Sequence, residues 1–574
     1  MLLALLLSCG APPPVVVTRA LPEAARLSQQ CDEAVGRARV EEPVPGVFVA
    51  IGYDLANPIL VATEEGNVLI DTGMSPTRAA PIREALAAVA PGPIVAVVYT
   101  HSHIDHVGGA SAWVEPDADI WATANFTEHF FKQYGVFQPI EAIRGARQFG
   151  WHVPESALPC SAIGRRIDLD AAVETGFLVP TRTFEGRADF TVGGVRFELH
   201  EAHGETHDEL FVWLPDKGAL LPGDNWYRAF HNLYTVRGTR PRPVDDWIDS
   251  LDAMRRLEPA ALIPSHTTPV LGREAVAEAL TTYRDGIQWV RDQVVQQANA
   301  GADIEAIVAA AGLPPSLAGS PYLDELYGQI DWSARAIYGN ELGWFDGRDE
   351  ALYPLPRPEL ADRSVAMMGG PAAVVAAARA AVEEEPRWAL HLLSLLEDSD
   401  GGSGGESAED SATADLDAVR ADALTALAGT VHNTNGRAWL MERVYELEHG
   451  RATLPEPVPG EALMAALPTS LIFEVMQTRL LSAEAAGVHE AMVFEFEDTG
   501  ERAFLTVRNG VLELAWGTPL PGTPEPVSVV TTTEATWRAV ALKARSPAAA
   551  IASGDLKASD LGAFAAFMGR FDQE

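Results

Sequence analysis

Two kinds of hydrophobic pattern divide the chain, and the first is an alternation of strand-like and helix-like segments over residues 35–275. Short runs rich in Val, Ile and Leu at residues 47–52, 68–73 and 94–100 are predicted strands. Residues 78–90 carry apolar side chains at helical spacing and are a predicted helix. Strands that alternate with helices in this way favour a layered α/β fold.

The second pattern is helical and begins after residue 275. Helical periodicity covers residues 278–299 and 371–396 and resumes over residues 416–449, while strand signals nearly vanish. Residues 397–415 are rich in Gly, Ser, Asp and Glu. Because such residues bury little apolar surface, we expect a solvated loop there.

A Pro-rich linker at residues 455–460 precedes a third region. Residues 492–496 and 503–514 are predicted strands, and Asn509-Gly510 marks a hairpin turn within the second stretch. Two predicted helices complete a small α+β domain, at residues 533–544 and 546–552.

The N-terminus is typical of an export signal. Residues 2–8 are apolar or small, too few to span a bilayer but suited to the apolar part of a signal peptide. The segment ending at Cys9 resembles the bacterial lipobox, in which the Cys is lipidated, and a Pro-rich tether follows. No Lys or Arg precedes the apolar run, so an ordinary apolar tail is the alternative. We expect a lipoprotein of the bacterial cell envelope or periplasm, secreted if not lipidated, with membrane contact only through Cys9.

Composition narrows the choice of partners. The 574-residue chain has 80 acidic and 42 basic residues and a net charge of −38, which argues against a nucleic-acid partner because that would need a basic face. The three cysteines fit neither a zinc ribbon nor a disulfide framework. If Cys9 is lipidated, Cys31 and Cys160 could pair, and the sequence leaves this open.

The strongest chemical signal is a His-rich segment directly after a predicted buried strand. His101 and His103 are two residues apart at the strand end, so both side chains project to one side. Asp105 and His106 follow on the turn into the next helix, before Gly108-Gly109. Unpaired buried polar groups cost too much for this set to be ordinary core. Three imidazoles and a carboxylate suit zinc or a similar divalent ion, and in this context a solvated His tract is the weaker interpretation.

The segment from His101 to His106 resembles the signature of the metallo-β-lactamase superfamily. That resemblance implies that Asp71 orients the ligands without binding metal and that His266 is the final metal-binding His.

Further motifs resemble the bacterial alkyl sulfatases, the class that cleaves dodecyl sulfate. They are Thr100-His101-Ser102-His103, Gly223-Asp224-Asn225, the segment from His231 to Gly238 and the Leu-Gly-Trp-Phe-Asp-Gly stretch at residues 342–347. The resemblance covers nearly the whole mature chain and implies a homodimer. The domains it implies are a signal and tether at 1–34, an αββα metallo-β-lactamase sandwich at 35–275, an all-α dimerisation domain at 276–452 and a sterol-carrier-protein-2-like α+β domain at 453–574.

Carried over position by position, the resemblance implies two zinc ions per chain. One ion would be held by His101, His103 and Glu205. The other would be held by Asp105, His106 and His266, with Asp224 bridging the two. His207 and Glu209 lie close in sequence to Glu205 and compete with it for that role.

Two further residues match family positions that hold the sulfate group, Asn232 and Arg237. The chemistry suits them, because Arg offers a planar fork to an oxyanion and Asn adds a neutral donor. A surface salt bridge is the alternative interpretation of Arg237. Together with Asp105 and Asp224, these two are the predicted catalytic residues.

The sequence departs from the family pattern at two places. Asp224 stands where alkyl sulfatases usually have Glu, but Asp bridges metals elsewhere in the superfamily, so metal binding should survive. Before the 342–347 stretch, Trp332-Ser333 and Glu341 replace a His-Asn pair and a Tyr. Because an acidic Glu341 would repel sulfate, either it points away or the natural substrate is not a simple alkyl sulfate.

The expected function is metal-dependent hydrolysis of an organic sulfate ester with an apolar tail, using metal-activated water. The family is associated with C–O cleavage and inversion. A lactone, phosphodiester or β-lactam substrate is an alternative at the same site, because a fold does not fix its function. A non-catalytic, lipid-binding envelope protein is the alternative from another class.

Overall fold

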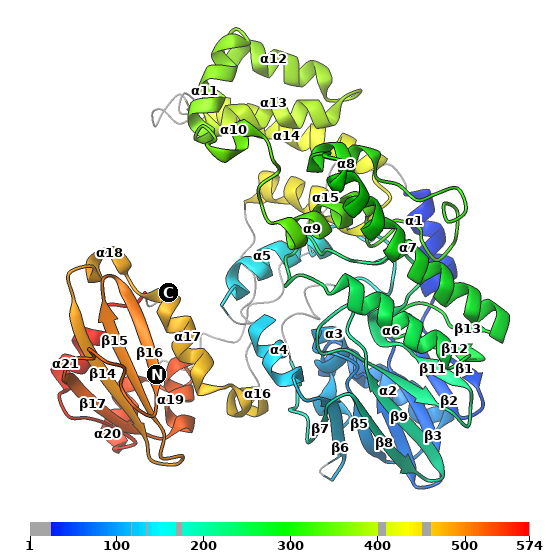
Figure 1. Cartoon of the computed structure of the whole chain (residues 1–574), viewed down its shortest axis with the longest axis horizontal. Helices are drawn as coiled ribbons and strands as arrows, with labels where there is room; N and C mark the ends of the chain where they lie inside the picture. Colours follow the sequence, from blue (N-terminus) through cyan, green and yellow to red (C-terminus); the bar gives the residue numbers. More distant parts are fainter. Residues whose placement is uncertain are drawn as a thin grey trace, which may run out of the picture. The chain divides into compact units, whose positions relative to one another are not determined.

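The computed structural model describes residues 24–115, 117–133, 136–167, 175–399, 409–450 and 461–572. The predicted signal with Cys9 and the linker at 455–460 lie outside these residues. The chain forms two compact units. The smaller unit comprises Thr127–Gln138, Phe177–Val179 and Pro459–Glu574, and the larger one holds the rest. Figure 1 shows the elements of both units.

Two β-sheets form the centre of the larger unit. The first has the order β1-β2-β3-β4-β5-β6-β7, antiparallel from β1 to β4 and parallel from β4 to β7. Its strands are β1 (Arg39–Val44), β2 (Val47–Ile51), β3 (Ile59–Thr63), β4 (Gly66–Ile70), β5 (Ile94–Val98), β6 (Asp119–Thr123) and β7 (Arg182–Phe184).

The second sheet has the order β13-β12-β11-β10-β9-β8 and is antiparallel except between β11 and β12. Its strands are β8 (Arg187–Val192), β9 (Val195–Glu201), β10 (Leu210–Leu214), β11 (Ala219–Leu221), β12 (Ala261–Leu262) and β13 (Val270–Leu271). Apolar side chains of the two sheets share one core, in which Val61 and Val98 of the first cluster with Phe197 and Val212 of the second.

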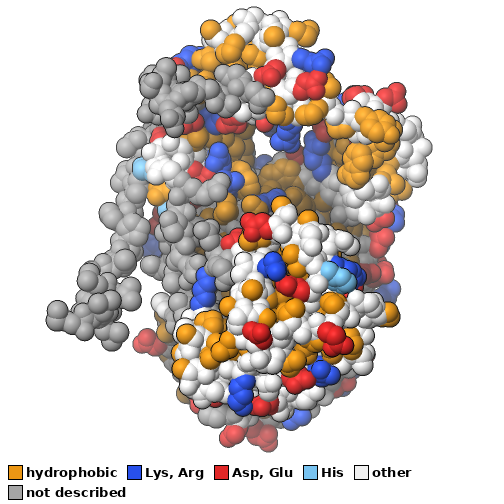
Figure 2. All heavy atoms as spheres, turned by 90° about the vertical axis from the view of Figure 1, so that its left-hand side faces the viewer, with side chains coloured by type: hydrophobic (Ala, Val, Ile, Leu, Met, Phe, Trp, Pro, Cys, Tyr) orange, Lys and Arg blue, Asp and Glu red, His pale blue; other side chains and the backbone are white. Residues whose placement is uncertain are grey.

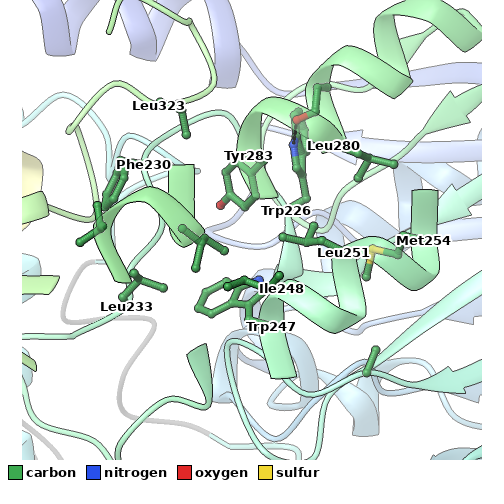
Figure 3. Packing of buried hydrophobic residues seen from close by; sticks show 14 of the residues in the cluster. Trp226, Phe230, Leu233, Trp247, Ile248, Leu251, Met254, Leu280, Tyr283 and Leu323 are labelled. Carbon is green, nitrogen blue, oxygen red and sulfur yellow. Dashed lines mark hydrogen bonds between the residues drawn. The ribbon is translucent and has the colours of Figure 1, made fainter. Parts of the chain in front are cut away.

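Helices cover the outer faces of this pair of sheets. α2 (Pro76–Val89) buries Ile82 and Leu86 against the first sheet. On the second sheet, α6 (Val244–Arg256) and the long α7 (Arg273–Asn299) close over a core that includes Trp247 and Tyr283 (Figure 3). The predicted αββα sandwich is confirmed.

The predicted strands and helix of this region are present, with one informative difference. The strand predicted over 68–73 ends at Ile70, because Asp71 takes a left-handed conformation with φ of 59°. That turn directs the Asp71 carboxylate towards the His-rich segment.

The region after α7 is helical, as predicted. Its helices are α8 (Ile304–Ala310), α9 (Ile330–Leu342), α10 (Asp349–Leu352), α11 (Arg357–Met367), α12 (Pro371–Ala381), α13 (Pro386–Asp398), α14 (Glu409–Thr430) and α15 (Thr434–His449). Among the described helices no single one has the length and apolarity of a membrane span. Only α11 and α12 together reach that level, and they meet at a bend of 84°.

The expected solvated loop at residues 397–415 is too long. α13 continues to Asp398 and α14 already begins at Glu409, so both ends of the segment are helical. Asp and Glu cost little at the solvated end of a helix, and composition alone therefore places a helix boundary poorly. The helical stretch predicted at 416–449 contains two helices, because α14 ends at Thr430 and Asn433 caps α15 by accepting from the Gly436 N–H.

The smaller unit contains a five-stranded sheet of order β16-β15-β14-β17-β18. Its strands are β14 (His489–Phe496), β15 (Arg502–Arg508), β16 (Val511–Trp516), β17 (Pro526–Thr532) and β18 (Leu556–Ala558), and its helices are α16 (Glu461–Ala466), α17 (Thr469–Arg479), α18 (Ser482–Ala485), α19 (Glu534–Ala541), α20 (Pro547–Ser553) and α21 (Leu561–Met568). Asn509 and Gly510 both have positive φ and join β15 to β16 in a two-residue hairpin, as predicted. The α+β class is confirmed, and likeness to sterol carrier protein 2 stays a prediction.

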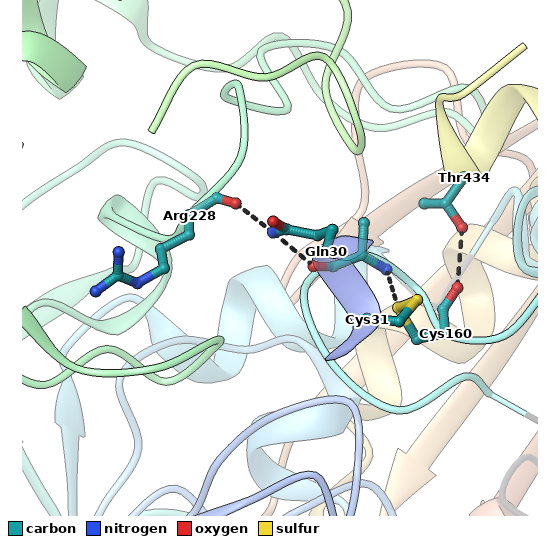
Figure 4. The surroundings of a disulfide bond; sticks show 6 residues. Gln30, Cys31, Cys160, Arg228 and Thr434 are labelled. Carbon is teal, nitrogen blue, oxygen red and sulfur yellow. Dashed lines mark hydrogen bonds between the residues drawn. A yellow bond between two sulfur atoms is a disulfide. The ribbon is translucent and has the colours of Figure 1, made fainter. Parts of the chain in front are cut away.

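A disulfide joins Cys31, next to α1 (Ala25–Gln30), to Cys160 in the loop after α5 (Gln138–Phe149) (Figure 4). The sequence left this pairing open. Gln30 Nε2 donates to the carbonyl of Arg228, and Thr434 Oγ1 donates to the carbonyl of Cys160. The bond therefore ties the N-terminal helix to a loop that also contacts α15.

Candidate metal centre

The seven predicted ligands meet at one end of the two central sheets. His101 and His103 follow β5, Asp105 and His106 lie on the short α3 (Ile104–Val107), and Glu205 lies between β9 and β10. Asp224 follows β11 and His266 follows β12. All seven side chains are buried, although they come from four separate stretches of the chain.

The ligand atoms form three groups that share members, and within each group the atoms lie within 4.8 Å of one another. They are His101, His106 and Asp224; Asp105, His106 and His266; and His103, Glu205 and Asp224. Asp224 is central, because its Oδ2 lies 3.1 Å from His266 Nε2 and its Oδ1 lies 3.4 Å from His106 Nε2. This is the arrangement expected of a carboxylate that bridges two cations.

Unpartnered atoms in the cluster indicate that it is built for cations. Within the described residues, His106 Nε2 and Asp224 Oδ1 are buried and have no hydrogen-bond partner. Leaving such atoms unpaired costs free energy, and a bound divalent cation would satisfy both. The donor set of imidazole nitrogens and carboxylate oxygens fits zinc and similar ions.

The two competitors of Glu205 point elsewhere. His207 Nε2 lies 2.9 Å from the carbonyl of Pro241. Glu209 is buried beneath Asp224 and accepts from its backbone N–H at 2.7 Å. Glu205 is therefore the carboxylate of this stretch that reaches the cluster.

The electrostatics prepare the site for positive charge. Burial, reinforced by nearby His106, lowers the pKa of His101 to about 3, so its imidazole is neutral. Burial opposes ionisation of Asp224, but His266, His106 and His101 together hold its pKa well below the ordinary value. Burial also disfavours charge on His106, yet Asp224 and Asp105 raise its pKa well above the ordinary value. The carboxylates of the cluster thus favour positive charge at this place, and imidazole ligands must be deprotonated to bind a metal.

Asp71 connects three segments of the site. Its carboxylate accepts from Thr100 N at 2.9 Å, Thr100 Oγ1 at 3.0 Å and Ser265 Oγ at 2.8 Å, and it lies 2.8 Å from His106 Nδ1. These contacts turn His106 Nε2 towards the cluster, as the resemblance implied for Asp71. His266 is oriented similarly, since its Nδ1 lies 2.8 Å from the carbonyl of Leu55.

Gly108 and Gly109 allow the ligand segment to lie against the neighbouring chain. A Cβ on Gly108 would lie 1.9 Å from the carbonyl oxygen of Met74, and one on Gly109 would lie 2.2 Å from that of Thr72. Any side chain would push α3 away from Asp71 and disturb the ligands.

The two predicted sulfate-binding residues lie beside the cluster. Arg237 Nη2 is 3.2 Å from His103 Nε2, which places the guanidinium next to a predicted ligand. Asn232 is buried, and within the described chain its carboxamide has no hydrogen-bond partner. Its backbone N–H donates to the Tyr227 hydroxyl at 2.9 Å. Both side chains have donors to offer to an oxyanion.

No pattern in the sequence predicted a role for Arg242 at the site. Its buried guanidinium contacts the Glu205 carboxylate and the carbonyl of Asn232 through Nη1. Its Nε and Nη2 are buried without a partner among the described residues. Only closeness in sequence to Arg237 hinted at this role, since Pro241 and Pro243 around it suggest an exposed loop.

Of the residues that depart from the family pattern, Asp224 lies in the cluster, whereas Trp332, Ser333 and Glu341 contribute no atom to its three ligand groups. Glu341 is exposed in the last turn of α9. Ser333 is buried and donates to the carbonyl of Gln329, while the Trp332 ring lies against Gly436 of α15. The exposure of Glu341 agrees with the explanation in which its side chain points away from the sulfate.

Three family models match the chain. The model of the metallo-β-lactamase superfamily matches residues 51–266, that of alkyl sulfatase dimerisation residues 303–450 and that of the alkyl sulfatase C-terminal region residues 459–574. Together they span the α/β, helical and C-terminal regions described above.

Individual relatives agree with these matches. A linear primary-alkylsulfatase of Pseudomonas sp. is 30% identical over 80% of this chain and 88% of its own length. An (R)-specific secondary-alkylsulfatase of Pseudomonas sp. is 31% identical over 82% of this chain and 72% of its own length. The solved structure of the stereoselective inverting sec-alkylsulfatase Pisa1 from Pseudomonas sp. superposes with a TM-score of 0.85 at 30% identity, covering 94% of this chain and 85% of that one.

Proposed function

Since the chain belongs to the alkyl sulfatase family of the metallo-β-lactamase superfamily, we propose that it is a metal-dependent hydrolase of alkyl sulfate esters with a dinuclear zinc site. The observation that carries the proposal is the convergence of seven buried side chains, Asp224 among them, in one cluster of ligand atoms. Nitrogen and oxygen donors of this kind suit zinc, and seven ligands that divide into two sets of three and one shared carboxylate suit two ions per chain.

In this proposal His101, His103 and Glu205 hold one ion, Asp105, His106 and His266 hold the other, and Asp224 bridges them. When bound, the two ions supply a water nucleophile at neutral pH and offset negative charge on the departing sulfate. Asp71 keeps His106 in the orientation and tautomer that presents Nε2 to the site.

The sulfate group is held by residues of the chain itself. Arg237 and Asn232 donate N–H groups to its oxygens, and Arg242 has two further nitrogen donors, Nε and Nη2, without a partner among the described residues. Because hydrolysis of the ester releases sulfate as an anion, donors fixed before the reaction stabilise its negative charge. The apolar tail is inferred from the alkylsulfatase relatives.

We infer a homodimer formed through the helical region. The match to the dimerisation model supports it, as does an apolar stripe on α11 formed by Leu360 and Met367. Leu360 is 50% and Met367 is 90% exposed, and their spacing of seven puts both on one helix face. Hydrophobic side chains also reach the surface in this region at the top of Figure 2.

We further propose that the protein is exported and anchored through Cys9 in the bacterial envelope. The Cys31–Cys160 disulfide supports this location, because such bonds persist in oxidising compartments and are rare in the cytosol.

A substrate panel with matched elemental analysis tests the proposed function. Purified protein is assayed on sulfate esters of different tails, dodecyl sulfate included, and on a lactone, a phosphodiester and a β-lactam. We expect sulfate release from the alkyl sulfates and two zinc ions per chain. Turnover confined to the other esters would replace the substrate class, and metal-free protein with retained lipid affinity would favour the non-catalytic alternative.

A further inference from the structure

Resting on the proposed function, we propose that Gln148 of α5 is the positioning residue that presents Arg237 to the sulfate group. No pattern in the sequence singles out Gln148. The assignment comes from its place between a helix and the loop that carries Arg237.

The first observation is the pair of hydrogen bonds that Gln148 accepts. Its side chain is 1% exposed, and its Oε1 accepts from Thr235 Oγ1 at 2.7 Å and from the Arg237 backbone N–H at 2.8 Å. One carboxamide oxygen therefore fixes both the backbone of Arg237 and the hydroxyl two residues before it.

The second observation is the direction that this imposes on Thr235. A hydroxyl has one hydrogen, and Gln148 Oε1 takes it. The oxygen lone pairs of Thr235 are then free to accept from Arg237 Nη1, which lies 2.8 Å away. The other end of the guanidinium lies beside His103. Without the acceptor at Gln148, the Thr235 hydroxyl is free to rotate and no longer orients Arg237.

The third observation is that α5 itself is anchored. Arg144 Nε donates to the carbonyl of Val236 at 3.0 Å, which adds a second link from α5 to the same loop. Arg147 pairs with Glu446 of α15 through two hydrogen bonds of 2.9 Å. Because α5 is also bound to α15, Gln148 is held in place and can keep Arg237 in one position.

The test compares two substitutions of similar size. Gln148→Met removes the acceptor, whereas Gln148→Glu keeps an acceptor oxygen at the same reach. In metal-loaded protein, Gln148→Met should raise KM for dodecyl sulfate and weaken inhibition by inorganic sulfate about tenfold, the usual effect of unpaired buried donors. Gln148→Glu should lose less affinity than Gln148→Met, because it keeps the acceptor even though its charge repels sulfate, and metal content should stay unchanged in both. Gln293→Met makes the same change at a half-buried residue of α7 and is the matched control.

A double-mutant cycle keeps the test decisive if Gln148→Met is poorly folded. Thr235→Val breaks the same link from its other end, so adding Gln148→Met should cost little more than Thr235→Val alone. Additive losses would overturn the assignment. Wild-type KM in Gln148→Met would do so as well.

The two proposals fail differently. Metal-loaded wild type that hydrolyses no alkyl sulfate would contradict the proposed function. Gln148 is then judged by the calorimetric affinity for inorganic sulfate, which Gln148→Met should still lower and which, if unchanged, rejects the positioning role.

Discussion

Asp71 contacts several of the segments that carry the metal ligands, although it coordinates no cation in our proposal. Four hydrogen-bonding groups from Thr100, Ser265 and His106 converge on its carboxylate. The left-handed backbone at Asp71 makes this possible, because it ends β4 one residue before the carboxylate. The orientation of His106 therefore depends on this one side chain, whereas His266 is oriented by the carbonyl of Leu55.

Replacing Asp71 by Ala should weaken zinc binding about 10–100-fold, the usual effect of losing a residue that orients metal ligands. His106 Nδ1 would lose its partner, and Nε2 would no longer be aimed at the cluster. Competition with a chelator measures the affinity. Asp189→Ala, at an exposed acid of β8, is the control, and equal zinc affinity in both variants would contradict this role.

Asp208 gives a pH-dependent prediction. Burial raises its pKa from 3.8 to about 7, against hydrogen bonds that include one from Ser102 Oγ. The folded protein therefore keeps a proton that the unfolded chain releases, so the free energy of unfolding falls as pH rises from about 4 to about 7 and is level above that. Asp208→Asn mimics the protonated form and should gain stability relative to wild type across this window. Melting temperatures of metal-free protein at pH 4 and pH 8 measure it, and an equal difference at both would refute it.

The sequence predicted ligands that share a motif and missed residues that act through distant partners. His101 to His106 sit together after a strand, so their chemistry can be recognised from spacing. Arg242 and Gln148 have no such context, because the groups they contact are 37 and 87 residues away in sequence, at Glu205 and Thr235. Only the fold brings these pairs together.

At the scale of secondary-structure elements, the disulfide between Cys31 and Cys160 links two segments, and the sequence left this pairing open. It closes a separation of 129 residues and holds α1 to the loop that contacts α15. The five strand segments and the one hairpin that were predicted are present, because apolar runs or an Asn-Gly turn mark them, whereas no prediction was made for the strands of the second sheet, β8 to β13. The end of α13 and the start of α14 were predicted poorly, because acidic residues suit both a helix end and a loop.

Replacing Cys31 and Cys160 by Ser together should lower the unfolding free energy by about 2–5 kcal/mol, since the unfolded chain regains the freedom that the bond removes. Thermal melts of wild type with and without reductant, beside the double variant, measure the effect. Identical melting temperatures for oxidised wild type and the double variant would show that the bond does not stabilise the fold.

At the scale of the whole molecule, the three regions follow the order of the alkyl sulfatase family models. The helical region contributes to the site within one chain, because α15 anchors α5 and α5 holds the Arg237 loop. The same region carries the exposed stripe of Leu360 and Met367. We therefore expect the dimer to form through that stripe.

Introducing charge by Leu360→Glu with Met367→Glu should convert the protein from dimer to monomer, because buried unpaired carboxylates oppose association. Sedimentation equilibrium at micromolar concentration measures the mass. Leu561→Glu, an exposed apolar residue of the smaller unit, should leave the dimer intact. A monomeric wild type, or a double variant that remains dimeric, would contradict the assignment of this surface.

Titration of cation-stripped protein with zinc, followed by sulfate release from dodecyl sulfate, tests the central claim most directly. Our account predicts no release from the stripped protein and activity that rises with zinc until two ions are bound per chain. Full turnover without any divalent cation would contradict it.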